Sequence, residues 1–441
     1  MQKGPRGGKE IYNRRRKELL NKLQGGVAII PSGQELIRNN DVHYPFRQDS
    51  CFYYLTGFIE PESVVILDPS SPNPFTMFVR ERDPSREIWD GFRYGIEGAG
   101  EYFGPNKVYP ISEFHTRLPE IVKNAEKIFY KIGENKEYDQ SIFEAMEKAR
   151  RLKGRSGIGV AALVDVKQII GEMRLFKTPE EIELLRKATE ISAHGHIAAM
   201  KVCKPGMFEY EIEAEVEREF RRRGADRLGY TSIVGSGANA TVLHYISNSD
   251  KMEKDQLLLI DAGAEFGYVT GDITRTFPVN GKFSASQKKF YEAVLTVQKD
   301  CINFVKPGGK LPDIHAHAIE GLTDAMVELG LLKGKRKELI ESRAFFKYYP
   351  HGTSHWLGMD VHDAGLYSLN GEPRKLEKNM CFTVEPGLYV SESDTEAPAE
   401  YRGMGVRIED DVVVTEKGCE VLTKLAPKEI SELEGFIGKS V

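Results

Sequence analysis

The most constraining feature of this 441-residue sequence is a set of carboxylates placed within or at the ends of apolar, strand-like segments. The set consists of Asp261, Asp272, Glu385 and Glu409. Asp261, for example, directly follows the run Leu-Leu-Leu-Ile at 257–260. A strand of this kind is buried inside a domain, so it draws the carboxylate at its end toward the interior. We therefore expect all four side chains to be largely buried.

Buried carboxylates require positive charge nearby, because an isolated one costs on the order of several kcal/mol. Lysine and arginine are scarce in the segments around the four acidic residues. Arg407 is one available partner, since side chains two apart on a strand share a face and Arg407 stands two residues before Glu409. Four carboxylates match two divalent cations in formal charge. The sequence therefore predicts a site for two divalent metal ions.

Histidines gather in one short stretch of the chain. Residues 351–355 read His-Gly-Thr-Ser-His, and His362 follows shortly after them. One imidazole added to four carboxylates forms an oxygen-rich ligand set with a single nitrogen. Such a set suits Mn²⁺, with Co²⁺, Fe²⁺ or Zn²⁺ as alternatives. A single aspartate in such a position is usually structural, and a single histidine is as often structural as a ligand, so it is the joint pattern that indicates a metal site.

The composition excludes several other classes of protein. The formal net charge of −5 offers no electrostatic reason to bind nucleic acid or an acidic membrane surface. No segment approaches the ~20 apolar residues of a membrane span, and the N-terminal residues lack the apolar core of a signal peptide. The five cysteines are scattered without a CxxC pair, as is typical of a reduced protein. We therefore expect a cytoplasmic protein without nucleic-acid or membrane partners.

The first part of the chain alternates strand-like and helix-like segments. A helical pattern over 11–24 ends at Gly25 and Gly26. The other predicted elements are strands over 27–30, 51–58, 63–67 and 75–79, and helices over 112–124 and 138–152. This alternation predicts an α/β N-terminal domain.

Long helices mark the start of the second part. Thr178 is placed as the N-cap of a helix and Pro179 as its first residue, with acidic residues in the first turn. A second helix is predicted over 208–224. Because the α/β pattern ends where these helices begin, we place the domain boundary just before them. The resulting domains are 1–172 and 173–441.

Strands return in the rest of the second domain. Segments 256–261 and 272–279 are predicted to pair in antiparallel fashion, because only a glycine-containing connection separates them. The other predicted elements are helices over 284–305 and 312–330, and strands over 381–384, 388–390 and 406–414. The predicted fold of this domain is α+β.

The ordered set of Asp261, Asp272, His355, Glu385 and Glu409 resembles the metal-binding signature of the creatinase/aminopeptidase, or pita-bread, superfamily. Within it, the string His-Gly-Thr-Ser-His-Trp-Leu-Gly-Met-Asp-Val-His-Asp most resembles that of bacterial-type Xaa-Pro aminopeptidases. The same family is matched at 44–50, 383–389 and 405–411. The resemblance covers roughly residues 27–425 and implies that the second domain is a pita-bread catalytic domain.

The resemblance implies a role for each metal ligand. Asp272 and Glu409 would bridge the two metal ions. Asp261 would complete one metal site, and His355 with Glu385 would complete the other. A water shared by the two ions would supply a bridging hydroxide near neutral pH. Glu385, which lies beside that water in similar enzymes, would act as the general base.

The resemblance also implies substrate contacts around the metals. His362 and His244 would polarise the scissile carbonyl and stabilise the oxyanion that develops from it. Arg407 would orient Glu409 and line the proline side of the site. The remaining predicted contacts are His351 and Tyr389 in the proline pocket and Tyr230 in the pocket for the first residue.

The implied activity is metal-dependent release of the N-terminal residue from peptides with proline in the second position, by a homodimer or homotetramer. Prolidase, which is restricted to Xaa-Pro dipeptides, is the nearest alternative, and Thr353-Ser354 and Trp356 around His355 favour the aminopeptidase. The connection at 368–374 is longer than usual, which leaves substrate contacts from that region open. A non-catalytic peptide-binding relative is a further alternative, disfavoured because all five ligand positions hold competent residues.

Overall fold

The computed structural model describes residues 4–438, and the chain in it divides into two compact units. The first unit ends at Gly171 and the second begins at Glu172. Among the described residues, no helix is long and apolar enough to span a membrane.

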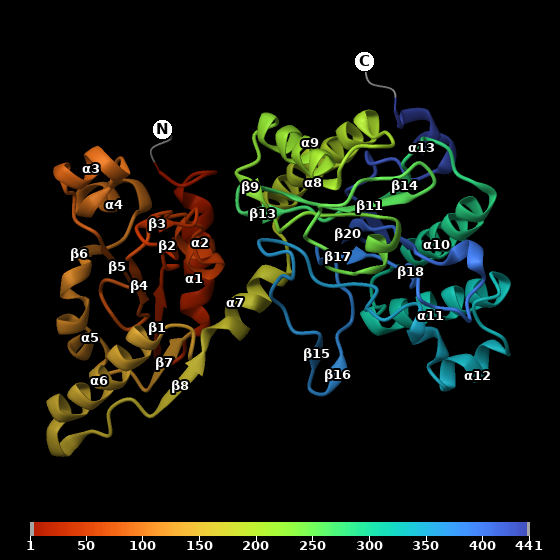
Figure 1. Cartoon of the computed structure of the whole chain (residues 1–441). Helices are drawn as coiled ribbons and strands as arrows, with labels where there is room; N and C mark the ends of the chain where they lie inside the picture. Colours follow the sequence, from red (N-terminus) through yellow and green to blue (C-terminus); the bar gives the residue numbers. More distant parts are fainter. Residues whose placement is uncertain (1–3, 439–441) are drawn as a thin grey trace. The chain divides into compact units, whose positions relative to one another are not determined.

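A six-stranded mixed sheet forms the centre of the first unit (Figure 1). Its order is β6 (Lys107–Pro110), β5 (Phe75–Val79), β4 (Val64–Leu67), β1 (Gly26–Pro31), β7 (Lys127–Tyr130) and β8 (Ala162–Asp165). Strand β4 pairs antiparallel with both β1 and β5, and the other neighbours are parallel. Helices α1 (Lys9–Lys22) and α2 (Ser50–Thr56) cover one face, and α5 (Phe114–Val122) and α6 (Lys136–Lys153) cover the other. The sheet is therefore enclosed on both faces, as expected for an α/β domain.

The strand predicted over 51–58 is wrong, because these residues form helix α2. The Asp49 side chain accepts the N–H of Phe52 as an N-cap, and Gly57 ends the helix with a left-handed φ of 66°. Every residue of α2 is buried. A helix that is buried all round has no polar face, so its sequence lacks the 3.6-residue period that would distinguish it from a strand.

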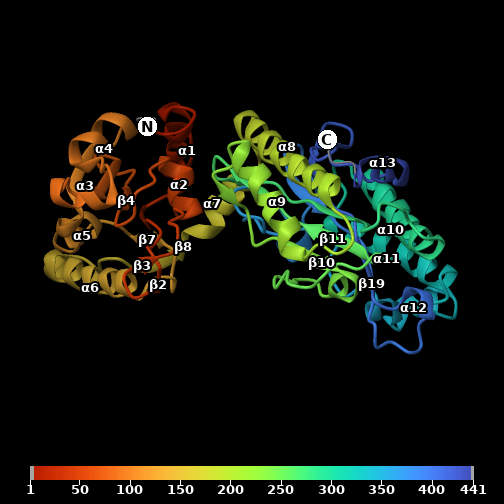
Figure 2. The ribbon, with the colours of Figure 1, turned by 45° about the horizontal axis from the view of Figure 1, so that its top comes forward.

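Two pairs of long helices enclose the strands of the second unit (Figure 2). The first pair is α8 (Pro179–Val202) and α9 (Glu209–Arg222), and the second is α10 (Ala285–Phe304) and α11 (Leu311–Glu328). The predicted start of α8 is confirmed. The Thr178 hydroxyl accepts the Glu181 N–H, and the Glu181 carboxylate accepts the Thr178 N–H in return.

Short antiparallel sheets lie between the helix pairs. They have the orders β10 (Ile233–Ser236), β11 (Leu257–Asp261), β14 (Thr274–Pro278); β17 (Cys381–Val384), β20 (Asp410–Val414), β21 (Cys419–Val421); and β18 (Gly387–Val390), β19 (Met404–Arg407). The predicted antiparallel pairing of β11 with β14 is confirmed and places Asp261 opposite Thr274. Their connection is longer than a tight turn, because it contains the hairpin of β12 (Ala264–Phe266) and β13 (Val269–Thr270).

The single strand predicted over 406–414 is wrong. It is divided into β19 and β20, which belong to different sheets. Between them, the Ile408 N–H donates to the carbonyl of Pro386 and the Glu409 N–H donates to the carbonyl of Thr274. These bonds to two different strands carry the chain from one sheet to the next. Glu409 therefore lies where the chain passes from the sheet of β18 and β19 to the sheet of β17, β20 and β21.

The remaining helices and strands either were not predicted from the sequence or are short. They are β2 (Ile37–Asn39), β3 (Val42–His43), α3 (Pro84–Asp90), α4 (Gly95–Phe103), α7 (Val166–Leu175), β9 (Arg227–Leu228), α12 (Arg336–Glu341), β15 (Ser368–Leu369), β16 (Glu372–Pro373) and α13 (Ile430–Phe436), with 3₁₀ turns at Ile111–Glu113, Gly154–Ser156, Gly237–Thr241, Ala344–Lys347 and Ala399–Tyr401.

Candidate metal centre and active site

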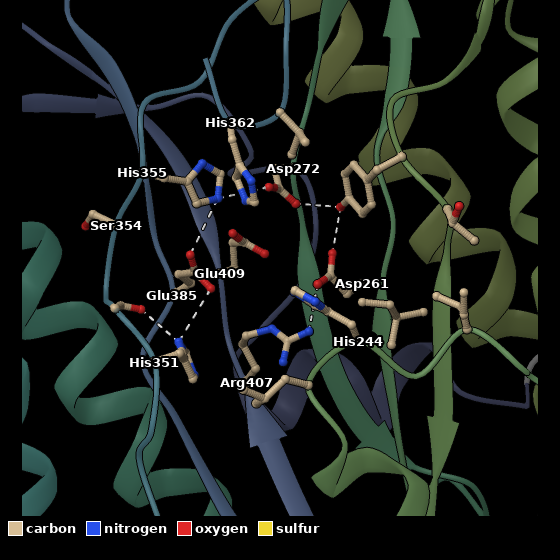
Figure 3. Close-up of a pocket in the computed structure, with 17 residues that line it drawn as sticks. His244, Asp261, Asp272, His351, Ser354, His355, His362, Glu385, Arg407 and Glu409 are labelled. Atoms are coloured by element: carbon tan, nitrogen blue, oxygen red, sulfur yellow. Dashed lines mark hydrogen bonds and ion pairs between the residues drawn. The ribbon is translucent and has the colours of Figure 1, made fainter. Parts of the chain in front are cut away.

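A cavity of about 460 Å³ opens in the second unit and has the acidic residues at its floor (Figure 3). Its volume falls within the range of small-ligand sites. Of the residues singled out in the sequence, it is lined by Tyr230, His244, Asp261, Asp272, His351, His355, His362, Glu385, Arg407 and Glu409. The predicted residues, drawn from segments far apart in the sequence, therefore meet in one place.

The pairing of strands brings the carboxylates together. Asp261 ends β11, and Asp272 lies just before β14, the strand that runs antiparallel to it. The Asp272 N–H donates to the buried Asp411 carboxylate at 2.8 Å, which ties the start of β14 to β20. The bond from the Glu409 N–H to the Thr274 carbonyl then places Glu409 beside both aspartates. Backbone pairing, together with the Asp411 carboxylate, thus brings three of the four acidic residues together.

Three side chains form a metal-competent group. Asp272, His355 and Glu409 each offer one ligand atom, and these atoms lie within 4.8 Å of one another. His355 Nε2 is 3.5 Å from Asp272 Oδ2 and 3.5 Å from Glu385 Oε1. Asp261 and Glu385 line the same cavity as this group. Carboxylate oxygens with one imidazole nitrogen are a ligand set for divalent first-row metals.

The electrostatics of the floor are those of a site that lacks positive charge. Burial and the neighbouring carboxylates of Asp272 and Glu385 raise the pKa of Glu409 well above its ordinary value. Burial also raises the pKa of Glu385 to about 7, although His355 and Arg407 oppose that rise. The positive groups that oppose these rises are the guanidinium of Arg407 and the imidazolium of His355, against four carboxyl groups. Divalent cations fit this donor set because they supply the missing charge.

The pKa of His355 also indicates that the acidic residues lack positive charge. Burial lowers its pKa, but the hydrogen bond that His355 donates to the Asp272 carboxylate and the charge of Glu385 outweigh burial and raise the pKa to about 9. Without metal, the nitrogen of such an imidazole binds a proton at the position where it would otherwise bind a metal ion. Its Nδ1 lies 3.1 Å from the Trp356 carbonyl, which leaves Nε2 facing the carboxylates.

Arg407 connects the acidic floor to the wall of the cavity. Its guanidinium donates to Asp261 Oδ2 at 2.6 Å and to the Tyr389 hydroxyl at 3.0 Å. Its Nε donates to the Thr274 hydroxyl at 3.0 Å, and that hydroxyl donates to Glu409 Oε2 at 2.7 Å. Arg407 therefore reaches Glu409 through Thr274, a link that the sequence did not predict.

His351 lines the cavity, whereas Tyr389 lies behind it. The Tyr389 hydroxyl is 2.8 Å from His351 Nε2, and Tyr389 is absent from the cavity lining within residues 4–438. Burial lowers the pKa of His351 to about 3, so the imidazole is neutral at physiological pH. Tyr389 thus supports the orientation of His351 and Arg407 from behind the cavity wall.

Tyr230 lies between the two aspartates of the floor. Its hydroxyl is 2.6 Å from Asp261 Oδ1 and also contacts Asp272 Oδ1. Burial and the two carboxylates raise the pKa of Tyr230 well above 10, so the phenol stays protonated and its O–H donates a hydrogen bond to one carboxylate at a time.

The two remaining histidines lie at the more open part of the site. His362 packs edge-on against His355 with ring centroids 4.4 Å apart, and Figure 3 shows it directly above the carboxylates. His244 reaches the cavity from the segment that follows the 3₁₀ turn Gly237–Thr241, near Asp261 and Arg407 in Figure 3. Both imidazoles are solvent-accessible and can meet a bound ligand.

Part of the cavity wall had no sequence signal. Single apolar side chains in ordinary strands and loops give no indication that they face a cavity. These additional lining residues are Thr231, Ile233, Leu243, Ile246, Ser354 and Val361. Among them, Ile233, Leu243, Ile246 and Val361 are apolar, and Thr231 and Ser354 are polar.

Comparison with protein families gives two matches that together span most of the chain. Residues 183–416 match the model described as metallopeptidase family M24, and residues 12–130 match that of the aminopeptidase P N-terminal domain. The chain is 42% identical over 432 residues to the Xaa-Pro aminopeptidase of Escherichia coli strain K12, covering 97% of this chain and 98% of that one. It is 36% identical over 422 residues to human Xaa-Pro aminopeptidase 3, covering 92% and 80% of the two chains.

Solved structures agree with these matches. An aminopeptidase of Pseudomonas aeruginosa has a TM-score of 0.94 at 43% identity, covering 97% of both chains. Zinc-substituted E. coli aminopeptidase P in complex with product has a TM-score of 0.94 at 41% identity, covering 97% of this chain and 98% of that one. The predicted fold, an α/β N-terminal domain followed by an α+β pita-bread catalytic domain, is therefore confirmed.

Proposed function

Since this chain belongs to metallopeptidase family M24, we propose that it is a dinuclear metalloaminopeptidase that releases the N-terminal residue from peptides with proline in the second position. The observation that carries the proposal is the group of Asp272, His355 and Glu409 donor atoms at the cavity floor. It lies in a chain that is 42% identical to a Xaa-Pro aminopeptidase over nearly its whole length.

We propose five residues that would hold the metal ions, two of which would be shared between them. The chain binds divalent metal, and Mn²⁺ is the proposed ion, with Co²⁺, Fe²⁺ or Zn²⁺ as alternatives. Asp272 and Glu409 are the proposed bridges, as the family resemblance implies, and both belong to the metal-competent group with His355. The other proposed ligands are Asp261, His355 and Glu385. Ions bound there would polarise the scissile carbonyl and lower the pKa of the attacking water.

Glu385 is the proposed carrier of the proton. Its Oε1 faces His355 Nε2 at 3.5 Å, and its Oε2 lies 3.8 Å from His351 Nδ1. The carboxylate therefore lies between the metal-competent group and the predicted proline pocket, where the scissile nitrogen must leave. A general base at this position can take a proton from the nucleophile and return it to the leaving amine.

The proposed substrate contacts surround this centre. His244 and His362 would donate to the scissile carbonyl oxygen as negative charge develops on it. His351, supported by Tyr389, would form the wall of the proline pocket, and Arg407 would line its inner side. Tyr230 would close the floor beneath the first residue. A proline nitrogen has no N–H to bind, so a shaped pocket must replace that contact.

The alternatives weighed from the sequence carry less support. A prolidase shares the fold and metals, but the two relatives compared above are both Xaa-Pro aminopeptidases. A non-catalytic role is disfavoured, because the chain keeps a metal-competent group inside an open cavity.

We further propose a homodimer or homotetramer in the cytoplasm, with domains 1–172 and 173–441. Ile88 and Trp89 on α3 are each 83% exposed, which is costly for a monomer in water and favours burial against another copy.

The proposed function is tested by comparing an Xaa-Pro dipeptide, an Xaa-Pro-Yaa tripeptide and the same tripeptide with an acetylated N-terminus. We expect release of free Xaa from the tripeptide and none from the acetylated form. Cleavage confined to the dipeptide would assign the chain to the prolidases instead. Cleavage of the acetylated peptide would contradict recognition of a free amine.

A further inference from the structure

Glu209 is a fully buried carboxylate outside the cavity, at the first residue of α9. It accepts five hydrogen bonds, and all five donors lie between residues 236 and 250. They are the Ser236 N–H at 2.7 Å, the Ser236 hydroxyl at 2.8 Å, the Asn239 amide at 3.1 Å, the Tyr245 hydroxyl at 2.9 Å and the Asp250 N–H at 2.9 Å.

Hydrogen bonds, rather than a cation, hold the charge of Glu209. Among residues 4–438, no lysine, arginine or histidine forms an ion pair with it. An ionised carboxylate is an acceptor with about four lone-pair sites, so it can satisfy several donors at once. The N-terminus of α9 also favours a negative charge at this position. Glutamate is therefore suited to gather five donors from one segment.

The segment that Glu209 holds carries one wall of the cavity. Leu243, His244 and Ile246 line the cavity, and Tyr245, which stands among them, turns to Glu209 instead. Asn248 provides a second anchor, because its side chain accepts the Val234 N–H at 2.9 Å and donates to the Ser232 carbonyl at 2.9 Å. Outside these anchors the wall is open to solvent, since 57% of Ile246 is exposed.

We propose that Glu209 is a positioning residue for substrate recognition: it holds segment 236–250 so that His244 and Ile246 face the substrate. The inference rests on the proposed function for the identity of that substrate. Glu209 contacts neither the cavity nor any proposed metal ligand, so its effect passes through His244 and its neighbours. Metal binding is expected to be independent of it.

Glu209→Gln tests this role, because it keeps the shape of the side chain and replaces one acceptor oxygen by an N–H₂ donor. That donor opposes some of the five donors that now point at the carboxylate. We expect kcat/KM for an Xaa-Pro-Yaa tripeptide to fall by about tenfold, the equivalent of one lost hydrogen bond to a charged group. Tyr245→Phe removes a single bond and leaves the carboxylate intact, so it should give a smaller fall in the same direction.

Glu219→Gln is the matched control. Glu219 is also buried on α9, but it pairs with Arg222 and Arg223 instead of the cavity segment. We expect it to leave kcat/KM near wild type. In a His244→Ala background, the effect of Glu209→Gln should be smaller than in the wild-type background, since His244, one of the two side chains through which it acts, is gone.

Hydrogen–deuterium exchange provides a readout that needs no activity. Glu209→Gln should raise exchange at Ser236 and Asp250 relative to Glu219→Gln, with bound metal per chain unchanged. If the wild type cleaves no Xaa-Pro peptide, the proposed function fails and the exchange experiment still decides the role of Glu209. Unchanged exchange, or a kcat/KM loss that adds fully to that of His244→Ala, would overturn the inference.

Discussion

Arg407 and Asp261 form a buried ion pair at the floor of the cavity, with Nη2 2.6 Å from Oδ2. The same guanidinium also donates to Tyr389 and Thr274, so a proposed metal ligand and the tyrosine behind the proposed proline wall share one support. Burial raises the pKa of Asp261, and the charge of Arg407 opposes that rise. The nearby Asp272 carboxylate adds to the rise, so the pKa stays above its ordinary value. One positive side chain therefore does not neutralise this floor, and metal ions are expected to do so.

Arg407→Lys should lower kcat/KM by about tenfold to a hundredfold. A lysine ammonium keeps the charge, but it lacks the planar fork that reaches Asp261, Tyr389 and Thr274 together. Each lost hydrogen bond to a charged partner is worth about 1.5–3 kcal/mol. Steady-state kinetics with metal analysis of the same sample would check this result. Near wild-type kcat/KM would show that Arg407 serves only as a counter-charge.

Glu385→Ala should remove turnover while the chain remains folded. Loss of a general base lowers the rate by about 10²–10⁴-fold, and loss of a metal ligand adds to that effect. Single-turnover assays would measure the rate, and circular dichroism would check that the melting transition persists. Turnover near that of the wild type would refute the role proposed for this carboxylate.

Removal of metal should inactivate the enzyme, and added Mn²⁺ should restore it. Because the cluster carries more carboxyl groups than positive side chains, metal-free protein should also unfold at a lower temperature than the loaded form. Activity and thermal unfolding after dialysis against a chelator would test both effects. Full activity in a preparation verified as free of metal would rule out a metallopeptidase mechanism.

A buried ion cluster behind His362 predicts a specific pH dependence of stability. Asp363 Oδ2 accepts from Lys177 Nζ at 2.8 Å, and Asp363 also contacts Arg174. Burial alone would raise the pKa of Asp363, but the charges of Arg174 and Lys177 overcome burial and hold the pKa below its ordinary value. The stabilisation is therefore fully present above the unfolded-state pKa, which is about 3.9. It is lost as the pH falls through the lower folded-state pKa.

Asp363→Asn should lower the free energy of unfolding by about 3 kcal/mol near neutral pH, because it leaves buried positive charge without its partner. Below about pH 4 the difference from the wild type should shrink, since the wild-type carboxylate becomes protonated as well. Urea unfolding at several pH values would measure the difference. A difference that stays constant down to pH 2 would contradict the cited pKa direction.

Local signals explain most of the fold that could be predicted from the sequence. Helix α8 was predictable because Thr178 and Pro179 specify its start within a few residues. Helix α2 was not, since burial on all sides removed the period from its sequence. The break before Glu409 depends on a bond to the carbonyl of Thr274, which is distant in sequence. No local pattern encodes such a bond.

The candidate site likewise contains residues that could be predicted from the sequence and residues that could not. The carboxylates could be predicted, because each lies within or at the end of an apolar strand-like segment. The place of Tyr230 between two aspartates depends on contacts 31 and 42 residues away. Glu209 is similar, since its donors lie 27 to 41 residues further along the chain. These positions follow from tertiary packing, which a single sequence does not reveal.

The central claim is that five side chains hold two metal ions, with Asp272 and Glu409 shared between them. It is tested most directly by a crystal of the Mn²⁺-loaded protein and an anomalous difference map recorded at the manganese edge. The account predicts two peaks in the cavity, both adjacent to Asp272 and Glu409. A single peak, or peaks away from these two residues, would contradict it.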